Sequence, residues 1–315
     1  MQVLMLSGED VQRLLDPDAL LEALAEEFKA LSEGTVSAPK RNEVAVGDAG
    51  LLLAMPAYRP GREITVKLVS LFHDNAARGL PAHHALICLF DAQTGVPIAV
   101  MDGTYITALR TAGAAALSAR ELARQDTRVL AIVGAGVQGQ AHLQMVPRVR
   151  PFDEIRITSR TPADAEQLAA MDSRAHAVAS VEEAVRGADV VCLCTSSGAP
   201  VLRRAWLAPG THVTSVGYRP PGGELDREVI EQGHLFVETR LAFAPPPAGC
   251  GELTGLDPES GTELGELLLG RRPSRQSETE ITVYKAMGHA CEDMAAASVV
   301  YQRARDAGAG AEVAL

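Results

Sequence analysis

The pattern of apolar and polar positions changes along the chain, and the change separates two kinds of structure. Near the start, apolar residues recur every three or four positions over residues 16–31, which predicts a helix with one buried face. Short apolar runs dominate residues 41–102, and the last two of them, 85–91 and 96–102, flank a loop that ends in Gly95. A glycine in this place favours a hairpin. We therefore expect an antiparallel sheet with helices in this part of the chain.

A different pattern begins near residue 119, where short β-branched runs alternate with stretches of helical spacing. Residues 129–133 are apolar throughout, as in a buried parallel strand, and the runs at 155–159, 190–194 and 212–216 repeat the pattern. This βα order is typical of a Rossmann-type, doubly wound parallel sheet. We accordingly predict an α/β protein with two domains. Their expected bounds are 119–288 for a dinucleotide-binding domain and 1–118 with 289–315 for an α+β domain made from both termini.

The sequence GAGVQG, residues 134–139, stands between the first strand of this second region and the helix that follows. Gly134 permits the tight turn, Gly136 lets a pyrophosphate approach the main chain, and Gly139 lets the helix pack closely. The first N–H groups of the helix and the positive end of its dipole then favour phosphate. In this context the motif predicts a dinucleotide site, and a glycine-rich turn that binds nothing is the alternative.

The end of the second strand decides which dinucleotide we expect. NAD-dependent enzymes usually place Asp or Glu about 20 residues after the motif, to hold the ribose 2′-hydroxyl. This chain has Ser159, Arg160 and Thr161 instead, and Arg160 lies 160 − 139 = 21 positions after the last glycine. Hydroxyls and a guanidinium suit a 2′-phosphate, so we predict NADP(H), with NAD(H) as the alternative. If Arg160 is only a solvated surface residue, this argument fails.

Further candidates follow from the places where parallel strands end. Ligands bind at the carboxyl ends of the strands in such sheets, and Thr195 and Val216 follow two of the predicted strands. The predicted cofactor contacts are Gly134, Gly136, Val137, Gln138, Gly139, Ser159, Arg160, Thr161, Thr195, Ser196, Val216 and Gly217.

Composition narrows the classes of function. The 315 residues are 47% hydrophobic and carry a net charge of −11, so two domains are expected, and nucleic acid and anionic membranes are poor partners. The apolar runs are far shorter than the roughly 20 residues of a membrane helix, and the N-terminus lacks the basic region of a signal peptide. We expect a cytoplasmic protein. The five cysteines and eight histidines show no metal-ligand spacing, and no metal is expected.

Two basic residues stand in apolar or small-residue surroundings. Lys67 interrupts the strand run 64–71, where it either lies on a solvated face or points into a cavity that receives an anion. Composition alone favours the solvated face. Arg110 is the only strong charge before Arg120 in a helix predicted over 104–122. A surface salt bridge is the plain interpretation of Arg110.

Five segments in this order resemble the ornithine cyclodeaminase/mu-crystallin family, and the resemblance covers nearly the whole chain. The two segments that contain Lys67 and Arg110 are specific for this family in combination, and neither is specific alone. The segments are Lys67–Ser70 with Asp74, Asn75 and Gly79–Pro81, then Phe90–Pro97, Thr107–Ala114, the GAGVQG turn and Thr282–Ala290.

The resemblance implies an NAD(P)-dependent enzyme that acts on α-amino or α-imino acids and forms a homodimer through the sheet domain, which also binds the substrate. The residues that match the family's basic positions, Arg41, Lys67 and Arg110, are expected to hold the substrate carboxylate. Thr111 is expected to reach a cofactor phosphate or the substrate, and Met287 is expected at the cofactor. Lys67, partly desolvated among cations, would have a lowered pKa and would exchange a proton with the imine nitrogen or a water.

One segment departs from the family's pattern. Cyclodeaminases carry an aspartate just after the strand-end Val-Gly, whereas this chain has Tyr218 and Arg219 there. An arginine in this position would repel the δ-ammonium of ornithine. Whether Glu224 or Asp226 replaces the aspartate stays open. The departure moves the expectation toward the ketimine reductase side of the family.

The expected reaction is therefore the NADPH-dependent reduction of a cyclic ketimine carboxylate to an L-proline-like amino acid. The substrate would be of the pyrroline-2-carboxylate or piperideine-2-carboxylate type. One alternative is an ornithine cyclodeaminase or an amino-acid dehydrogenase of the alanine type. Another is a protein that binds NADPH and a small carboxylate without turnover.

Overall fold

The computed structural model describes residues 1–219, 222–246 and 248–314. Contacts within the described residues define two compact units, residues 1–110 with 289–315 (unit 1) and residues 111–288 (unit 2). The helix α3 (Thr104–Leu122) begins in unit 1 and ends in unit 2. The domain bounds that the sequence predicts, with the first change at residue 119, stay a prediction.

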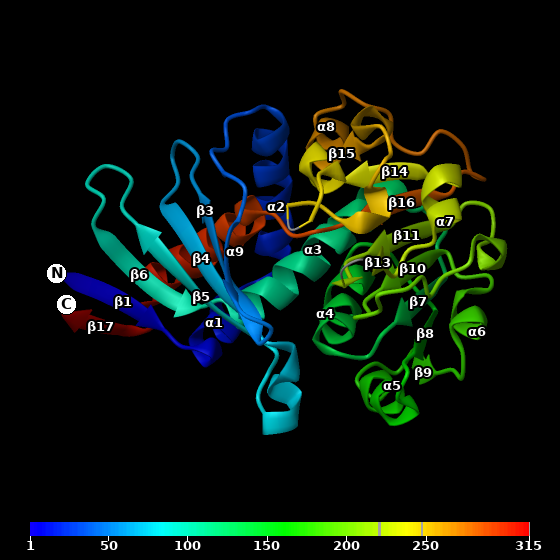
Figure 1. The fold of residues 1–315 in the computed structure, drawn as a ribbon, viewed down its shortest axis with the longest axis horizontal. Helices are drawn as coiled ribbons and strands as arrows, with labels where there is room; N and C mark the ends of the chain where they lie inside the picture. Colours follow the sequence, from blue (N-terminus) through cyan, green and yellow to red (C-terminus); the bar gives the residue numbers. More distant parts are fainter. Residues whose placement is uncertain (220–221, 247, 315) are drawn as a thin grey trace. The chain divides into compact units, whose positions relative to one another are not determined.

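Unit 1 is built on a seven-stranded sheet among the described residues (Figure 1). In spatial order its strands are β17 (Ala311–Ala314), β1 (Gln2–Leu6), β6 (Pro97–Asp102), β5 (His83–Phe90), β4 (Ile64–Leu71), β3 (Gly50–Ala57) and β2 (Asn42–Val46). The neighbours from β6 to β2 are antiparallel, which confirms the sheet that the apolar runs predict. β1 pairs in parallel with β6 and antiparallel with β17, so both ends of the chain lie in one sheet.

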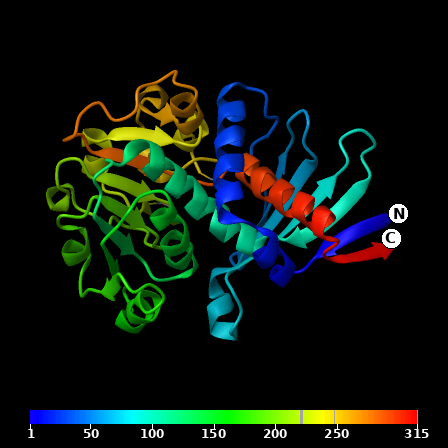
Figure 2. The same ribbon diagram turned by 180° about the vertical axis from the view of Figure 1, so that it is seen from behind.

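Helices cover one face of this sheet. They are α1 (Gly8–Leu14), α2 (Pro17–Ser32) and α9 (Ala290–Ala307). A 3-10 helix at His73–Arg78 lies in the connection between β4 and β5. The helix predicted over 16–31 is α2; the Asp16 carboxylate caps its first turn, and its apolar residues Leu20, Leu24 and Phe28 are buried. α2 packs against α9, and α9 packs against β3, β4 and β5 (Figure 2).

The other face of the sheet is also apolar. Along β3, β4 and β5 every second residue is buried under the helices, and the residues between point to the opposite side. There Leu52 faces Ser70, and Leu68 faces Leu86 across neighbouring strands. Leu52 remains 39% exposed and Leu86 52% exposed. An apolar sheet face of this kind requires a cover, because unpartnered apolar surface is unfavourable in water.

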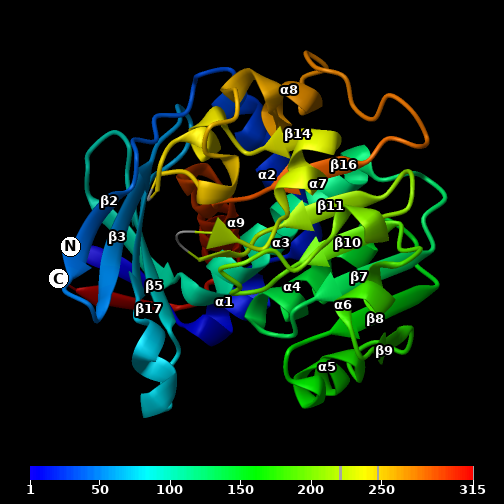
Figure 3. The same cartoon turned by 45° about the vertical axis from the view of Figure 1, so that its right-hand side comes forward.

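Unit 2 contains an eight-stranded sheet among the described residues, and all its strand pairs are parallel (Figure 3). In order the strands are β15 (Thr262–Glu263), β14 (His234–Val237), β16 (Thr282–Lys285), β11 (His212–Ser215), β10 (Val190–Leu193), β7 (Val129–Val133), β8 (Glu154–Thr158) and β9 (Ala175–Ala177). The chain runs outward from β7 through β8 to β9, then returns to β10 on the other side. This reversal is the switch point of a doubly wound Rossmann sheet, as predicted.

Short helices connect these strands. They are α4 (Val137–Met145), α5 (Pro162–Ala169), α6 (Val181–Val185), α7 (Arg227–Gln232) and α8 (Leu264–Leu268), with 3-10 turns at Val146–Arg148, Arg204–Trp206, Arg240–Phe243, Gly251–Leu253 and Pro258–Ser260. A two-stranded ribbon, β12 (Tyr218–Arg219) with β13 (Gly222–Gly223), follows β11.

Two local predictions were wrong. The sequence of residues 201–207, VLRRAWL, predicts a helix, but a single 3-10 turn forms there, at Arg204–Trp206. The terminal position of residues 308–315 predicts a frayed end, but Ala311–Ala314 form β17 and pair with β1, while Leu315 lies outside the described residues. Gly308 ends α9 with a φ of +59°, and this left-handed turn sends the chain back along the sheet.

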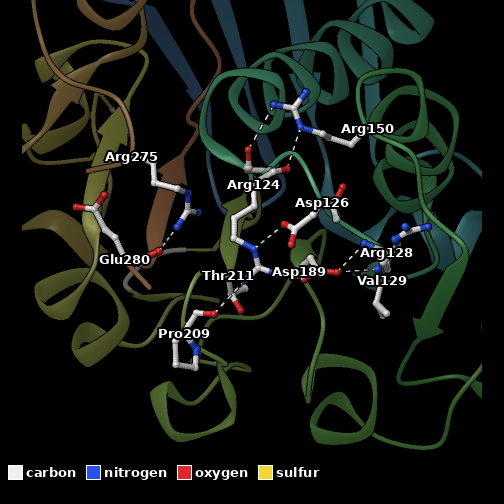
Figure 4. Close-up of polar contacts among 12 residues, drawn as sticks. Arg124, Asp126, Arg128, Val129, Arg150, Asp189, Pro209, Thr211, Arg275 and Glu280 are labelled. Atoms are coloured by element: carbon white, nitrogen blue, oxygen red, sulfur yellow. Dashed lines mark hydrogen bonds and ion pairs between the residues drawn. The ribbon is translucent and has the colours of Figure 1, made fainter. Parts of the chain in front are cut away.

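The C-terminal end of α3 is held by arginine side chains of unit 2 (Figure 4). The guanidinium of Arg150 donates to the carbonyls of Arg120 and Arg124, and Arg275 donates to the carbonyl of Leu122. Carbonyls at a helix end lack partners within the helix, and cations suit the negative end of its dipole. The predicted helix over 104–122 is thus found at its predicted bounds. None of the helices in the described part of the chain has both the length and the apolar character that a membrane span requires.

Candidate active site

A cavity of about 860 Å³ lies at the carboxyl ends of β7, β8 and β10 in unit 2. Its walls come from four segments, residues 133–138, 158–161, 179–181 and 194–198. Single residues beyond these are Asp164, Val201 and Arg219. The volume suits a large part of a dinucleotide, since small-molecule sites span roughly 300–1,000 Å³.

The GAGVQG turn forms the part of this cavity where phosphate is expected. Gly134 has a φ of +108°, and a side chain there would lie 2.4 Å from the carbonyl oxygen of Cys194, so only glycine fits. Gly139 packs so tightly that an added Cβ would lie 2.0 Å from the Gly134 carbonyl oxygen. By contrast, an added Cβ on Gly136 meets nothing within 4 Å. The open space at Gly136, at the start of α4, fits an anionic group of a cofactor.

The second strand, β8, ends at the same cavity. Ser159, Arg160 and Thr161 all line it, as the sequence predicts for residues that read the adenosine ribose. Asp164, in the first turn of α5, also lines it and was not a candidate. Asp164 lies three positions past Thr161, where an acid is usual in the first turn of a helix, so the sequence offers no signal that separates this acid from a helix cap.

Of the other predicted cofactor residues in unit 2, some line the cavity and some do not. Thr195 and Ser196 line the cavity, whereas the described lining does not include Thr111, Gly139, Val216, Gly217 or Met287. Val216 and Gly217 follow β11, and the Gly217 N–H donates to Glu224 over 2.6 Å. The Met287 N–H donates to Glu238 over 2.9 Å. Their cofactor roles stay predictions.

A buried cluster of charges lies in unit 1, on the face of the sheet that carries the helices. Lys67 from β4 is 2% exposed, and its Nζ lies 2.8 Å from the carboxylate of Asp293 in the first turn of α9. Arg110 from α3 is 4% exposed; its Nε lies 3.1 Å from Asp293 and its Nη1 lies 2.9 Å from Glu292. Neither cation lies on the surface, so the solvated interpretation of Lys67 and the surface salt bridge of Arg110 are wrong.

Burial and neighbouring charge set the protonation of this cluster. Loss of water lowers the pKa of Lys67 from 10.5 to about 8; the Asp293 charge opposes this fall, and the Arg110 charge adds to it. Burial by itself would raise the pKa of Asp293, but Lys67 and Arg110 together lower it. Burial, followed by the charges of Lys67 and Arg110, lowers the pKa of His83 on β5 to about 4.

The third predicted cation, Arg41, precedes β2 in the same unit. Burial lowers the pKa of His289, the N-cap of α9, and among the charges that act on His289 the positive ones of Arg41 and Arg110 lower it further. Unit 1 therefore brings Arg41, Lys67 and Arg110 toward the start of α9. Their binding of a substrate carboxylate stays a prediction.

Sequence reasoning missed Glu292 and Asp293. They lie in the GHACED segment, where two acids at the start of a helix have an ordinary explanation as partners of the helix dipole. Their contact with the two cations could not be predicted from local spacing, because Lys67 and Asp293 are 226 residues apart in the sequence. Among the described residues no cluster of His, Cys, Asp and Glu is arranged to hold a metal ion.

The question left open for Glu224 and Asp226 has a structural answer. Glu224 is fully buried and accepts hydrogen bonds from Thr195, Ser215 and Gly217. Asp226 caps α7 and accepts from the Glu228 N–H over 3.0 Å. Both carboxylates are therefore engaged within unit 2. Arg219, at the position where the family's aspartate was expected, lines the cavity.

Comparison with known proteins gives full-length matches. A sequence profile of the ornithine cyclodeaminase/mu-crystallin family matches residues 1–308. Ketimine reductase mu-crystallin of Mus musculus is 38% identical over 304 residues, which cover 94% of this chain and 96% of that protein.

Solved structures match as fully. Δ1-Pyrroline-2-carboxylate reductase of Thermococcus litoralis, in complex with NADH and L-proline, aligns with a TM-score of 0.93 and 32% identity over 99% of this chain and 100% of that one. An archaeal alanine dehydrogenase dimer with bound NAD aligns with a TM-score of 0.91 and 30% identity over the whole of both chains.

Proposed function

This chain belongs to the ornithine cyclodeaminase/mu-crystallin family, and we propose that it is an NADPH-dependent oxidoreductase that reduces a cyclic ketimine carboxylate to an L-proline-like amino acid. Pyrroline-2-carboxylate and piperideine-2-carboxylate are the substrate types. The observation that carries the proposal is the buried lysine of unit 1. Lys67 lies against a carboxylate and its pKa is about 8, so it can give a proton to an imine nitrogen near neutral pH.

We also propose where a substrate carboxylate binds. Lys67 and Arg110 pair with the carboxylates of Asp293 and Glu292. Arg41 is a further cation of the same unit, and its charge acts on His289 at the start of α9. The carboxylate of the substrate is then attracted to Arg41 and to the donors of Arg110, which leaves Lys67 to face the imine nitrogen.

The proposed reaction needs a hydride and a proton. Reduced nicotinamide, when bound, would supply the hydride for the C=N carbon. Lys67 supplies the proton, which passes from Nζ to the ring nitrogen, so that one C–H and one N–H bond form and the C=N double bond becomes single. Asp293 stays ionised beside Lys67 and stabilises its charged form before the transfer.

The preference for NADPH rests on the end of β8. Ser159, Arg160 and Thr161 line the cavity, and none of them is the acid that would hold a 2′-hydroxyl and repel a 2′-phosphate. Asp164 lies in the same cavity and acts against this preference. We propose NADP(H) over NAD(H), because Arg160 and the hydroxyls of Ser159 and Thr161 together favour a 2′-phosphate more than Asp164 disfavours it.

The apolar outer face of the sheet in unit 1 supports a homodimer. Val44, Leu52 and Leu86 are 60%, 39% and 52% exposed. Val44 on β2 pairs with Leu52 on β3, and all five residues of β2 are exposed. A second copy of the chain would bury the same residues on both sides, as a two-fold interface does. The archaeal alanine dehydrogenase with a similar fold is described as a dimer.

Substitution of Lys67 tests the proposal. Lys67→Met keeps most of the volume but removes the proposed proton donor and one of the two basic partners of Asp293. We expect kcat/KM for pyrroline-2-carboxylate with NADPH to fall by about 100-fold or more, because general acid catalysis contributes about 10²–10⁴. Lys29→Met is the matched control, since Lys29 only pairs with Glu26 on the surface of α2. Near-normal activity of Lys67→Met would refute the role of Lys67.

A further inference from the structure

A second buried network of charged side chains lies in unit 2, and the proposed chemistry does not use it. It consists of Glu224, Glu252 and Lys285, all of them buried. Lys285 is the last residue of β16, and Glu224 follows the β12–β13 ribbon. The three residues meet at the carboxyl ends of β10, β11 and β16, the edge of the sheet that carries the cavity.

Glu224 joins two of these strand ends. One carboxylate oxygen, Oε2, accepts from the N–H and the hydroxyl of Thr195, both over 2.7 Å. The other, Oε1, accepts from the Ser215 hydroxyl over 2.9 Å and from the Gly217 N–H over 2.6 Å. Four donors fill the acceptor positions that a carboxylate offers. Glu224 therefore has no position left for the amine of a substrate.

The partners of Glu224 shape the cavity. Thr195 lines it, and the main-chain carbonyl of Glu224 also accepts from the N–H of Val201, another lining residue. The glycine-rich turn lies against the same segment, because an added Cβ on Gly134 would be 2.4 Å from the Cys194 carbonyl oxygen. A shift of Thr195 would thus be transmitted to the turn that is expected to hold phosphate.

Lys285 binds Ser215 and Gly217, two of the residues that also bind Glu224. Its Nζ donates to the Gly217 carbonyl over 2.7 Å and to the Ser215 hydroxyl over 3.1 Å, and pairs with Glu252 at 2.7 Å. Gly217 is thus fixed at both its N–H and its carbonyl. The fit leaves no room for a side chain, since an added Cβ on Gly217 would lie 2.0 Å from the Thr195 carbonyl oxygen.

We propose that Glu224 is a positioning residue of the dinucleotide pocket, which acts by fixing Thr195 and Gly217, and that it does not replace the substrate-binding aspartate of cyclodeaminases. Lys285 supports it by fixing the opposite side of Gly217. The inference concerns cofactor binding. It rests on the proposed function only for the identity of the dinucleotide.

Glu224→Gln tests this role with almost no change of shape. Each carboxylate oxygen accepts one main-chain N–H, so either orientation of the amide sets its NH2 against a main-chain donor. We expect the Kd for NADPH, measured by fluorescence titration of the full-length protein without substrate, to rise by about tenfold or more. The KM for pyrroline-2-carboxylate at saturating NADPH should stay within about threefold of wild type. The control is Glu231→Gln, a surface residue of α7 that pairs with Arg227.

A milder variant keeps the test decisive if Glu224→Gln does not fold. Ser215→Ala removes one hydroxyl donor and keeps both main-chain donors, so a rise in Kd of about two- to fivefold is expected. Two results would overturn the proposal. An unchanged Kd with a raised KM would make Glu224 a substrate ligand, and an unchanged Kd with a lower melting temperature would make it a scaffold residue only.

The experiment also separates this proposal from the proposed function. NADPH and NADH are titrated independently, and neither titration requires turnover. If the wild type binds a dinucleotide but reduces no imine, the proposed function fails while the comparison of Kd values still decides the role of Glu224.

Discussion

At the scale of single residues, the proposed role of Lys67 as proton donor depends on Asp293. Burial lowers the pKa of Lys67, and the carboxylate 2.8 Å away raises it, so that the pKa stands at about 8. A donor with this pKa is charged at neutral pH and still acidic enough to give up its proton. Without Asp293 the ammonium would lose its proton at a lower pH.

The pH dependence of activity follows from this balance. Lys67 carries its proton below about pH 8 and loses it above, so kcat/KM for imine reduction should fall as the pH rises through about 8. Asp293→Asn removes the charge that raises this pKa. We expect the falling limb to move to lower pH by about one unit or more. The measurement is kcat/KM against pH with one substrate, so that titration of the substrate itself affects both proteins equally.

Further charged or titratable groups face this cluster. Arg110 on α3 and Glu292 on α9 act on Lys67, and Lys67 acts on His83 on β5. His289, the N-cap of α9, is acted on by Glu292, Asp293, Arg41 and Arg110. Asp306→Asn, an exposed substitution on the same helix, is the control and should leave the limb in place. A limb of Asp293→Asn that stays at the wild-type pH, or moves upward, would contradict the assignment of Lys67 as the proton donor.

The placement of some site residues could be predicted from the sequence and that of others could not, for a physical reason. The glycine-rich turn and Arg160 belong to one βαβ unit, β7–α4–β8, and both line the cavity, so their placement follows from local spacing. Lys67 could not be placed that way, because its burial depends on Asp293, which is 226 residues away. The same holds for Glu224, whose partners are Thr195, which follows β10 and is 29 residues away, and Ser215, the last residue of β11, which is 9 residues away.

At the scale of helices and strands, elements with a strong local pattern could be predicted, and those fixed by distant partners could not. The helix over 104–122 and the strand–turn–helix around Gly134 were found as expected. β17 was missed because its four residues are all exposed, so no alternation marks them; only pairing with β1 makes them a strand. The expected helix over 201–207 forms a single 3-10 turn, with a cation–π contact of Arg203 over Trp206 at 5.5 Å.

The outer face of the sheet in unit 1 gives a prediction at this scale. Leu86→Glu places a charge in the apolar face beside Leu68, and two copies would have to bury it without a partner. We expect the variant to be monomeric, with a mass near 33.2 kDa by light scattering, and we expect the wild type to have twice that mass. Met171→Glu is the control, because Met171 is equally apolar and 60% exposed but lies in unit 2. A Leu86→Glu protein that keeps the doubled mass would show that the dimer uses another face.

At the scale of the whole molecule, the residues of the proposed function come from two units. Unit 2 supplies a cavity with a glycine-rich turn and an arginine at the end of the second strand. Unit 1 supplies a buried lysine held by a carboxylate, with two arginines in the same unit. The fold class and the family could be predicted because both rest on motifs spread over nearly the whole chain. The choice between substrates could not, because it depends on side chains from distant segments.

The most direct test of the account is the oxidation of NADPH by the purified protein in the presence of pyrroline-2-carboxylate, followed by absorbance. Parallel reactions contain NADH in place of NADPH, and ornithine with NAD⁺. The Arg160→Asp variant is measured beside the wild type, because an acid at the end of β8 should favour a free 2′-hydroxyl over a 2′-phosphate.

We predict that the wild type oxidises NADPH with a kcat/KM at least about tenfold above that for NADH, and that Arg160→Asp removes this preference. L-Proline should accumulate in step with NADPH loss. The opposite result is equally clear: NADPH and NADH both stay reduced with the imine, while ornithine yields proline and ammonia. That outcome would contradict the reductase assignment and make the protein a cyclodeaminase.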